Sequence, residues 1–370
     1  MMSFNDAYAG RRVLVTGHTG FKGAWLVEWL LRLGADVTGY ALEPPTTPSL
    51  FEACGLGGRL HHVVADVRDR DRLAAEMAAA RPSVVFHLAA QAIVRTAYAR
   101  PRETFETNVM GTVNLLEAAR PCDSVEAVVI VTSDKSYQNL EVRRPFRETD
   151  AMGGRDPYSA SKGATELVVD AYRQSYFAEG AAVASVRAGN VIGPGDWAAD
   201  RIVPDIVRAV TAGEPVVVRN PDAVRPWQHV LEPLSGYLWL GARLLRDGHD
   251  FAGAWNFGPS DAGGDRTVRW LVEEFLDAWG VGEWVAPPIA APQPHEAHHL
   301  ALDISKARDR LGWAPVWDAA EAVRRTAAWY AAYDADPGTA RPLLDGQLGA
   351  YEADARAAGL VWAADDGGAG

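Results

Sequence analysis

The chain has very little cysteine: Cys54 and Cys122 are the only two among its 370 residues. Two cysteines are too few for a disulfide framework, and their wide separation does not match the short spacings of cysteine-based metal sites. Free cysteines suit a reducing compartment, so we expect a cytoplasmic protein.

Long apolar runs are also missing. No stretch approaches the ~20 uninterrupted apolar residues that a membrane-spanning helix needs. Residues 1–12 contain no apolar segment typical of a signal peptide. We therefore expect no membrane span, no secretory signal and no membrane partner.

Positive charge is scarce as well. The 36 Lys and Arg residues are outnumbered by 48 Asp and Glu residues, which gives a net charge of -12 at pH 7. This excess of negative charge disfavours nucleic acid and anionic membranes as partners. If the substrate is an anion, a local cluster of Arg side chains or helix N-termini must bind it.

A glycine-rich segment is the first strong positive signal. Val13–Val15 is typical of a buried parallel strand, glycines follow, and Ala24–Leu31 is typical of an apolar helix. In this context the first glycine allows a tight turn, the second lets the backbone approach a pyrophosphate, and the third allows the helix to pack closely on the strand. We expect the following residues of this turn to bind a dinucleotide: Gly17, His18, Gly20, Phe21, Lys22 and Gly23.

Apolar segments and helical segments alternate through the first half of the chain. Further strands are predicted at residues 35–41, 63–67, 84–91, 128–135 and 183–192. This alternation predicts an α/β fold with a Rossmann-type, doubly wound parallel sheet. Ligands of such sheets bind at the carboxyl ends of the strands. We expect further cofactor-binding residues at these ends and on neighbouring segments: Tyr40, Asp66, Val67, Leu88, Ala89, Ala90, Gln91, Asn108 and Arg187.

Three of these positions leave a choice open. The second strand ends near Tyr40 and Glu43, and no Arg stands there to bind a 2′-phosphate, which favours NAD over NADP. Asp66 either binds the adenine or caps the helix that begins near Asp71. Asn108 either contacts the cofactor or bridges backbone groups inside the protein.

The alternation becomes irregular after residue 193, where Pro and Trp become frequent. We predict an NAD-binding domain over residues 1–193, completed by a segment near 229–260 in which Trp255–Gly258 returns a strand to the sheet. A smaller α+β substrate lobe over residues 194–345 is interleaved with it. Residues 346–370 form a C-terminal extension whose end, from Ala363 onward, is predicted to be disordered.

Tyr158 and Lys162 follow Pro157 and lie four residues apart, which places them on one face of a helix. A phenol with an ordinary pKa near 10 is a poor base at neutral pH. A neighbouring ammonium group and a bound nicotinamide cation both lower this pKa toward the range that a general base needs. Ser133, at the end of a predicted strand, can hydrogen-bond the same substrate hydroxyl. We predict that Ser133, Tyr158 and Lys162 are catalytic, and that Tyr158 and Lys162 also bind the cofactor.

These features resemble the extended short-chain dehydrogenase/reductase family that acts on nucleotide sugars, and most closely its 4,6-dehydratase branch. The similarity runs from about Gly10 to about Tyr330. The motifs that carry it are TGHTGFKG (16–23), HLAAQ (87–91), TSDK (132–135), YSASK (158–162), RAGNVIGPGDW (187–197), RPWQHVLEPLSGY (225–237) and HEA (295–297).

The resemblance implies tightly bound NAD and a reaction with no net redox change. Tyr158 takes the proton of the sugar 4-hydroxyl while C4 is oxidised, water leaves across C5 and C6, and the hydride returns to C6. Asp134 protonates the leaving 6-hydroxyl, and Lys135 acts at C5. The better-known dTDP-glucose dehydratases carry Asp-Glu at this point. A Lys base must be neutral, which burial or nearby cations would favour; an exposed Lys135 would only neutralise charge.

Other functions are compatible with this fold. A nucleotide-sugar 4-epimerase uses the same Ser, Tyr and Lys, but it needs no acid–base pair for elimination, so Asp134 and Lys135 favour dehydration. A non-catalytic NAD-binding regulator would have no use for an activated phenol. The sequence leaves open which nucleotide sugar is dehydrated.

Substrate-binding residues are expected mainly in the smaller lobe, because the planar guanidinium group of Arg matches phosphate oxygens. The candidates are Gln91, Asn190, Arg201, Arg219, Arg225 and His229. A second set could be mistaken for a metal cluster, but the chemistry above needs no metal and we predict none. It comprises His295, Glu296, His298, His299 and Asp303.

The resemblance also implies a homodimer. The helix over residues 101–119 and the helix over residues 158–176 would pair with their copies in a second chain. The latter is apolar on more than one face, which suits burial against a partner.

Overall fold

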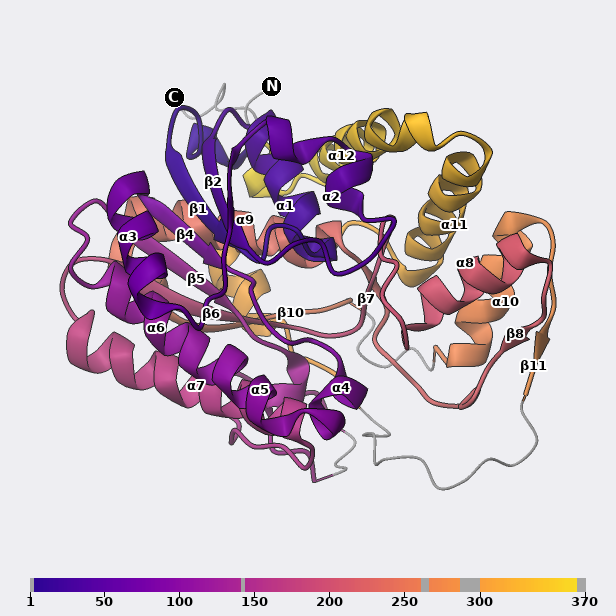
Figure 1. Cartoon of the computed structure of the whole chain (residues 1–370), viewed down its shortest axis with the longest axis horizontal. Coiled ribbons are helices and arrows are strands. Elements are labelled where there is room, and N and C mark those ends of the chain that lie inside the picture. Colours follow the sequence, from indigo (N-terminus) through magenta and orange to yellow (C-terminus); the bar gives the residue numbers. More distant parts are fainter. Residues whose placement is uncertain (1–2, 141–143, 261–265, 287–299, 365–370) are drawn as a thin grey trace.

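The computed structural model describes residues 3–140, 144–260, 266–286 and 300–364. Its centre is a seven-stranded parallel sheet in the order β3-β2-β1-β4-β5-β6-β10 (Figure 1). The strands are β1 (Arg12–Thr16), β2 (Asp36–Ala41), β3 (His61–Val64), β4 (Val84–His87), β5 (Ala127–Val131), β6 (Ala182–Ala188) and β10 (Gly253–Phe257). Because the strand order reverses between β1 and β4, this is the doubly wound Rossmann topology, and the predicted fold class is confirmed.

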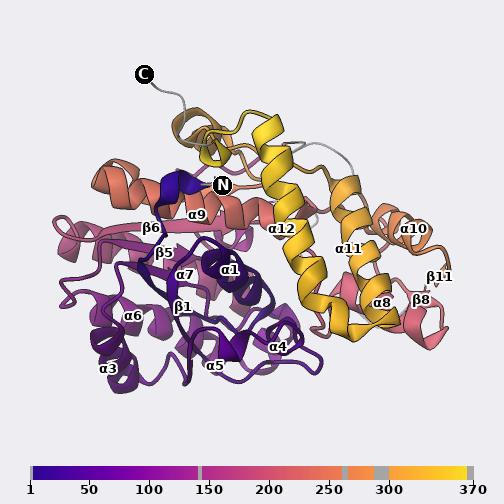
Figure 2. The same cartoon turned by 90° about the horizontal axis from the view of Figure 1, so that it is seen from above.

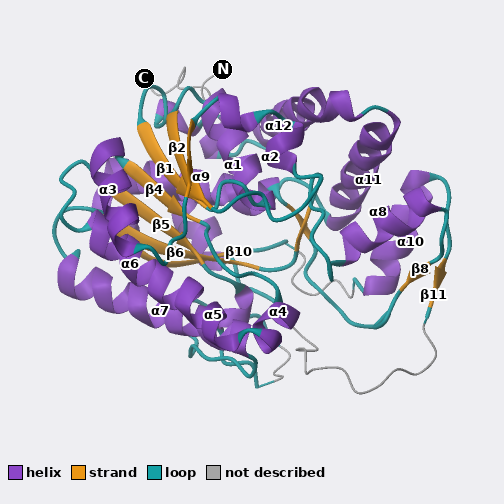
Figure 3. Ribbon diagram, in the orientation of Figure 1, coloured by secondary structure: helices purple, strands orange, loops and turns teal. Residues whose placement is uncertain are grey.

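Helices cover both faces of the sheet (Figure 3). Side chains alternate between the faces of a strand, so Val13 and Val15 of β1 join one core while Leu14 joins another. The first core contains α1 (Phe21–Arg32) and α9 (Leu231–Asp247), and the second contains α3 (Arg70–Ala80), α6 (Gly111–Ala119) and α7 (Pro157–Tyr176). This double cover explains why the strands are apolar throughout.

The helix predicted over residues 101–119 is interrupted. It consists of α5 (Pro101–Phe105), a π-helical turn over Glu106–Met110, and α6. Two short helices precede it, α2 (Leu50–Ala53) and α4 (Val94–Ala99). The buried Asn108 lies in the π turn, where its side chain hydrogen-bonds to neighbouring elements.

The smaller lobe lies at the right of Figure 1 and carries α8, α10 and α11. Its elements are α8 (Ile202–Ala212), β8 (Val216–Val217), α10 (Val268–Trp279), β11 (Trp284–Val285) and α11 (Ala319–Ala335). The strand predicted over residues 183–192 is two strands: β6 ends at Ala188, and β7 (Val191–Ile192) leaves the main sheet to pair with β9 (Gln228–His229). The predicted return of a strand near Trp255 is confirmed by β10, which pairs with β6.

The C-terminal segment packs back onto α1 (Figure 2). Within α12 (Ala340–Ala357), Glu352 accepts a hydrogen bond of 2.9 Å from the Trp29 indole. The ring of Trp362 stacks on Phe4 with centroids 4.9 Å apart. Ala363, predicted to begin a disordered tail, is instead buried in the main hydrophobic core beside Trp362. Residues 365–370 lie outside the described residues.

Within the described parts of the chain, no helix is both long and apolar enough to cross a membrane.

Candidate active site

A cavity of about 890 Å³ opens where the carboxyl ends of the strands face the smaller lobe. Its walls are the glycine-rich turn after β1, the segments that follow β4 and β5, the start of α7, and two further segments within residues 188–205 and 217–225. This is the position at which doubly wound sheets bind their ligands.

The glycine turn has the shape that a dinucleotide needs. Gly17 has a φ of +74°, and a Cβ on it would lie 2.6 Å from the amide nitrogen of Ala89. A Cβ on Gly23 would lie 2.1 Å from the carbonyl oxygen of Gly17. Gly20 caps α1 without a side chain, so the first N–H groups of the helix face the cavity wall and can bind phosphate.

Several predicted cofactor residues line this cavity. They include Gly17, Gly20, Phe21, Lys22, Gly23, Asp66, Val67, Leu88, Ala89, Ala90, Gln91, Tyr158 and Lys162. The Asp66 carboxylate accepts three hydrogen bonds from Arg68, which hold the pKa of Asp66 below its ordinary value. Asp69, not Asp66, caps α3, so the capping alternative for Asp66 is wrong.

Asn108 does not line the cavity. It lies behind the cavity wall and hydrogen-bonds to residues of neighbouring segments. Its side-chain oxygen accepts a hydrogen bond of 2.8 Å from the Gln91 amide, and its side-chain nitrogen donates to the Gln91 carbonyl at 3.1 Å. It also donates to the Ser161 hydroxyl at 2.8 Å. Of the two roles left open for Asn108, the structure supports the bridging one.

His18 and Tyr40 are likewise not brought to the cavity wall. The Nε2 of His18 lies 2.7 Å from the Nδ1 of His62, and burial lowers the pKa of His18 to about 3. The Tyr40 hydroxyl donates to the Asp66 carbonyl at 2.9 Å. Both side chains therefore make hydrogen bonds within the protein and do not line the cavity, contrary to the prediction.

Arg187 and His229 are buried away from the cavity as well. Arg187 forms an ion pair of 2.7 Å with Glu166 of α7. The ring of His229 packs against Trp25 and Trp317, at centroid distances of 5.9 and 4.9 Å, and burial lowers its pKa to about 3. Neither side chain is in a position to bind the cofactor or the substrate as predicted.

The structure brings Ser133, Tyr158 and Lys162 together in one wall. Asp156 caps α7 and Pro157 occupies its first turn, so Tyr158 enters the cavity at the helix start. Burial raises the pKa of Tyr158 to about 12, and a hydrogen bond with Ser133 opposes this. Burial also lowers the pKa of Lys162 to about 8, while its ammonium group donates to the Val131 carbonyl at 3.2 Å.

Asp134 and Lys135 follow directly in a short 3-10 turn. The Ser133 hydroxyl donates to Oδ1 of Asp134 at 3.0 Å and accepts from the Lys135 amide at 3.2 Å. Burial raises the pKa of Asp134 above its ordinary value, although Lys135 opposes the shift. The other oxygen, Oδ2, is buried and has no hydrogen-bond partner within the described residues, and Asp134 itself lines the cavity. Lys135 is half-buried and lines the same cavity.

Cationic side chains of the smaller lobe face this pair. Arg201, Arg219 and Arg225 all line the cavity, as does Asn190. Arg201 donates to Asp196 at 2.8 Å, and Arg219 lies 3.4 Å from Asp200. These three Arg side chains are the local cationic groups that an anionic substrate requires in an acidic protein, and two of them are held in place by carboxylates of the same wall.

Sequence reasoning missed part of this wall. Lys22 was predicted only to bind the cofactor, yet its charge also interacts with Arg201, Asp134 and Lys162, and burial lowers its pKa to about 8. Asp196 and Trp197 line the cavity and lie inside a motif already recognised, so that motif could have identified them. Arg95, which lies 3.3 Å from Asp200, had no comparable signal.

The alternative metal cluster falls mostly outside the described residues, since only Asp303 of its members is described. The described residues contain no group of three or more His, Cys, Asp or Glu side chains placed to bind a metal ion.

Three comparisons relate this site to known proteins. The sequence model of the NAD dependent epimerase/dehydratase family matches residues 13–252. The CDP-glucose 4,6-dehydratase of Salmonella typhimurium is 49% identical over 333 residues, which cover 88% of this chain and 92% of that protein.

Solved structures agree with this similarity. A UDP-glucose 4-epimerase from Thermus thermophilus in complex with NAD has a TM-score of 0.75 at 28% identity, covering 86% of this chain and 98% of that one. The dTDP-glucose 4,6-dehydratase DesIV from Streptomyces venezuelae, with NAD bound, has a TM-score of 0.73 at 28% identity, covering 90% of this chain and 99% of that one.

Proposed function

Because the chain belongs to the NAD dependent epimerase/dehydratase family, we propose that it converts CDP-D-glucose into CDP-4-dehydro-6-deoxy-D-glucose and water. The observation that carries dehydration is the buried Asp134 beside Ser133, with one carboxylate oxygen unpaired at the cavity. The choice of CDP-glucose rests on the 49% identity to the Salmonella enzyme.

NAD is the cofactor, and the residues present fit it. The glycine turn and the uncapped start of α1 would hold its pyrophosphate, and Asp66 its adenosine end. Leu88–Gln91, Tyr158 and Lys162 line the remainder of that side of the cavity. When bound, the cofactor supplies the acceptor for the C4 hydride and its donor to C6.

Tyr158 removes the proton of the sugar 4-hydroxyl. In the free protein its pKa is raised to about 12, so the phenolate needs stabilisation. The positive charge of Lys162, four residues along the same helix, supplies part of it. Ser133 orients the sugar hydroxyl through its own hydroxyl group.

Asp134 is the acid that protonates the leaving 6-hydroxyl, since burial favours its protonated form. Lys135 removes the C5 proton from its half-buried position beside Asp134. The C4 carbonyl that precedes this step makes the C5 proton acidic. Arg201, Arg219 and Arg225 bind the diphosphate, and Asn190 and Gln91 help to place the substrate.

We further propose a cytoplasmic homodimer that pairs through residues 101–119, which comprise α5, the π turn and α6, and through α7. Large apolar side chains are exposed along these elements, namely Phe105, Met110, Leu167 and Tyr176. Exposed apolar side chains that gather on neighbouring helices are typical of a protein interface. Cys54 and Cys122 are both free, which fits a reducing compartment.

Incubation of the purified protein with CDP-glucose, with no NAD added, tests the function by mass spectrometry of the sugar nucleotide. Loss of one water would support both the dehydratase and a retained cofactor. An unchanged mass with a new 4-epimer would replace dehydration by epimerisation. If the protein dehydrates only another nucleotide-linked glucose, the proposed mechanism stands and only the assignment of the nucleotide changes.

A further inference from the structure

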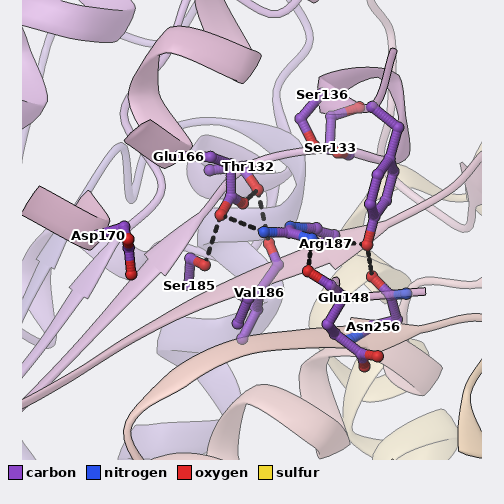
Figure 4. A network of polar contacts seen from close by, with 12 residues as sticks. Thr132, Ser133, Ser136, Glu148, Glu166, Asp170, Ser185, Val186, Arg187 and Asn256 are labelled. Carbon is purple, nitrogen blue, oxygen red and sulfur yellow. Dashed lines mark hydrogen bonds and ion pairs between the residues drawn. The ribbon is translucent and has the colours of Figure 1, made fainter. Parts of the chain in front are cut away.

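A buried carboxylate on α7 joins three elements behind the active site. Glu166, one turn beyond Lys162, is only 4% exposed. Its Oε2 accepts hydrogen bonds of 2.7 Å from Ser185 and from Arg187, both on β6. Its Oε1 accepts a hydrogen bond from the hydroxyl of Thr132, at the end of β5 (Figure 4). The carboxylate is thus satisfied by three donors.

Arg187 is itself fixed on its far side, so Glu166 cannot shift easily. Its guanidinium group donates to the Tyr137 hydroxyl at 2.7 Å and to the Glu148 carbonyl at 3.3 Å. Tyr137 in turn donates to Asn256 of β10 at 2.7 Å. A buried ion pair is stable when further hydrogen bonds complete it, and this one is anchored on the edge strand of the sheet.

Thr132 is the point at which this network reaches the catalytic residues. Its neighbour Ser133 carries the catalytic hydroxyl, and its other neighbour Val131 accepts the hydrogen bond from Lys162. The Thr132 amide is also fixed, because it donates to the Val186 carbonyl at 2.9 Å. The Thr132 hydroxyl therefore links the segment that carries Ser133 and Asp134 to the helix that carries Tyr158 and Lys162.

We propose that Thr132 and Glu166 are positioning residues for the dehydration, whose hydrogen bond holds Ser133 and Asp134 in place relative to Tyr158 and Lys162. This inference rests on the proposed function. In this arrangement Arg187 does not bind the cofactor; it holds the carboxylate of Glu166 in place through their ion pair.

The chain provides a matched control for this role. Ser185 donates to the same carboxylate as Thr132, and both hydroxyls are buried. Ser185 lies in the middle of β6 and is not adjacent to a catalytic residue. If the carboxylate only needs donors for stability, the loss of either hydroxyl has the same consequence. If the carboxylate positions the active site, only the loss of the Thr132 hydroxyl slows the reaction.

The test compares Thr132→Val, Thr132→Ser and Ser185→Ala by steady-state kinetics and thermal unfolding. Misplacement of reacting groups by about 1 Å can lower a rate about 100-fold, so we expect Thr132→Val to lower kcat about tenfold or more with KM within about twofold. Thr132→Ser keeps the hydroxyl and should restore kcat. Ser185→Ala should lower Tm as much as Thr132→Val but leave kcat near that of the wild type.

Equal kcat values for Thr132→Val and Ser185→Ala would overturn the inference, as would a Thr132→Ser variant as slow as Thr132→Val. If Thr132→Val does not fold, Thr132→Ala replaces it in the same comparison. An inactive wild-type protein would instead refute the proposed function, so the two failures are distinguishable.

Discussion

The carboxylate oxygen Oδ2 of Asp134 lies 3.1 Å from the position that a Cβ atom would take on Gly189. The same Cβ would lie 3.0 Å from Cγ of Pro226. A methyl group there would displace Asp134 by a few tenths of an ångström, because the proline ring cannot yield as easily. We predict that Gly189→Ala lowers kcat about tenfold, as misplaced catalytic groups do, while the protein still folds.

Gly346→Ala is the matched control, since a Cβ at this helical position of α12 would meet nothing within 4 Å. It should leave kcat unchanged and raise stability by about 0.5–1 kcal/mol, because Ala is a better helix former than Gly. A Gly189→Ala enzyme with wild-type kcat would show that Asp134 tolerates the shift.

Asp134→Asn should separate proton removal at C5 from the loss of water. The amide cannot protonate the leaving 6-hydroxyl, whereas Tyr158 and Lys135 are untouched. The variant is incubated with CDP-glucose in deuterated water. We predict that the sugar then gains deuterium at C5, but that it loses water at least 100-fold more slowly than with the wild-type enzyme. Water loss at the wild-type rate would assign the acid to another group.

Arg219 should contribute to substrate binding more than to the chemical steps. Hydrogen bonds to charged groups contribute about 1.5–3 kcal/mol, so Arg219→Ala should raise KM about 10- to 100-fold with kcat within about twofold. Arg308→Ala is the control, because this side chain is 62% exposed and does not line the cavity. The assignment of Arg219 to the diphosphate is wrong if both variants have the same KM.

Glu232 should make the stability depend on pH. It is fully buried beneath α11 and α12, where it accepts hydrogen bonds from the amides of Val316 and Trp317 and from the Tyr351 hydroxyl. Burial raises its pKa from 4.5 to about 7. The folded state therefore binds the proton more tightly than the unfolded state, so this contribution is complete below about pH 4.5 and is lost as the pH rises through about 7.

Thermal unfolding of the wild type and Glu232→Gln between pH 4.5 and 8 measures this contribution. The free energy of unfolding of the wild type, taken relative to the variant, should fall by about 3 kcal/mol over this range. A difference that stays constant with pH would mean that Glu232 titrates normally.

The proposed dimer makes a prediction about α7. Leu167 is 64% exposed in the isolated chain, and a charge at the centre of an apolar interface is costly. Leu167→Glu should yield monomers in sedimentation at micromolar concentration, where the wild type is dimeric. Val281→Glu, at a 62% exposed position of the smaller lobe, should leave the dimer intact. A wild type that sediments as a monomer would refute the dimer itself.

The sequence could predict the strands because buried parallel strands are apolar throughout, and their ends because polar or small residues follow. Ser133 could be placed in the cavity for this reason, and Tyr158 because Pro157 and the spacing to Lys162 predict the start of a helix. His18 and Arg187 were wrongly predicted to bind the cofactor, because their roles depend on His62 and Glu166, partners from distant elements that no local pattern identifies. The π turn around Asn108 has no periodicity of its own, so a single helix was the natural expectation.

The stacking of Trp362 on Phe4 has a consequence for biosynthesis. Chains leave the ribosome from the N-terminus onward, so Phe4 and Trp29 emerge long before the tryptophan that covers them. Until residue 362 has been translated, this apolar surface on the first helix of the nascent chain stays open to solvent and to chaperones. The packing of Phe4 and Trp29 is thereby completed only after residue 362 has been made.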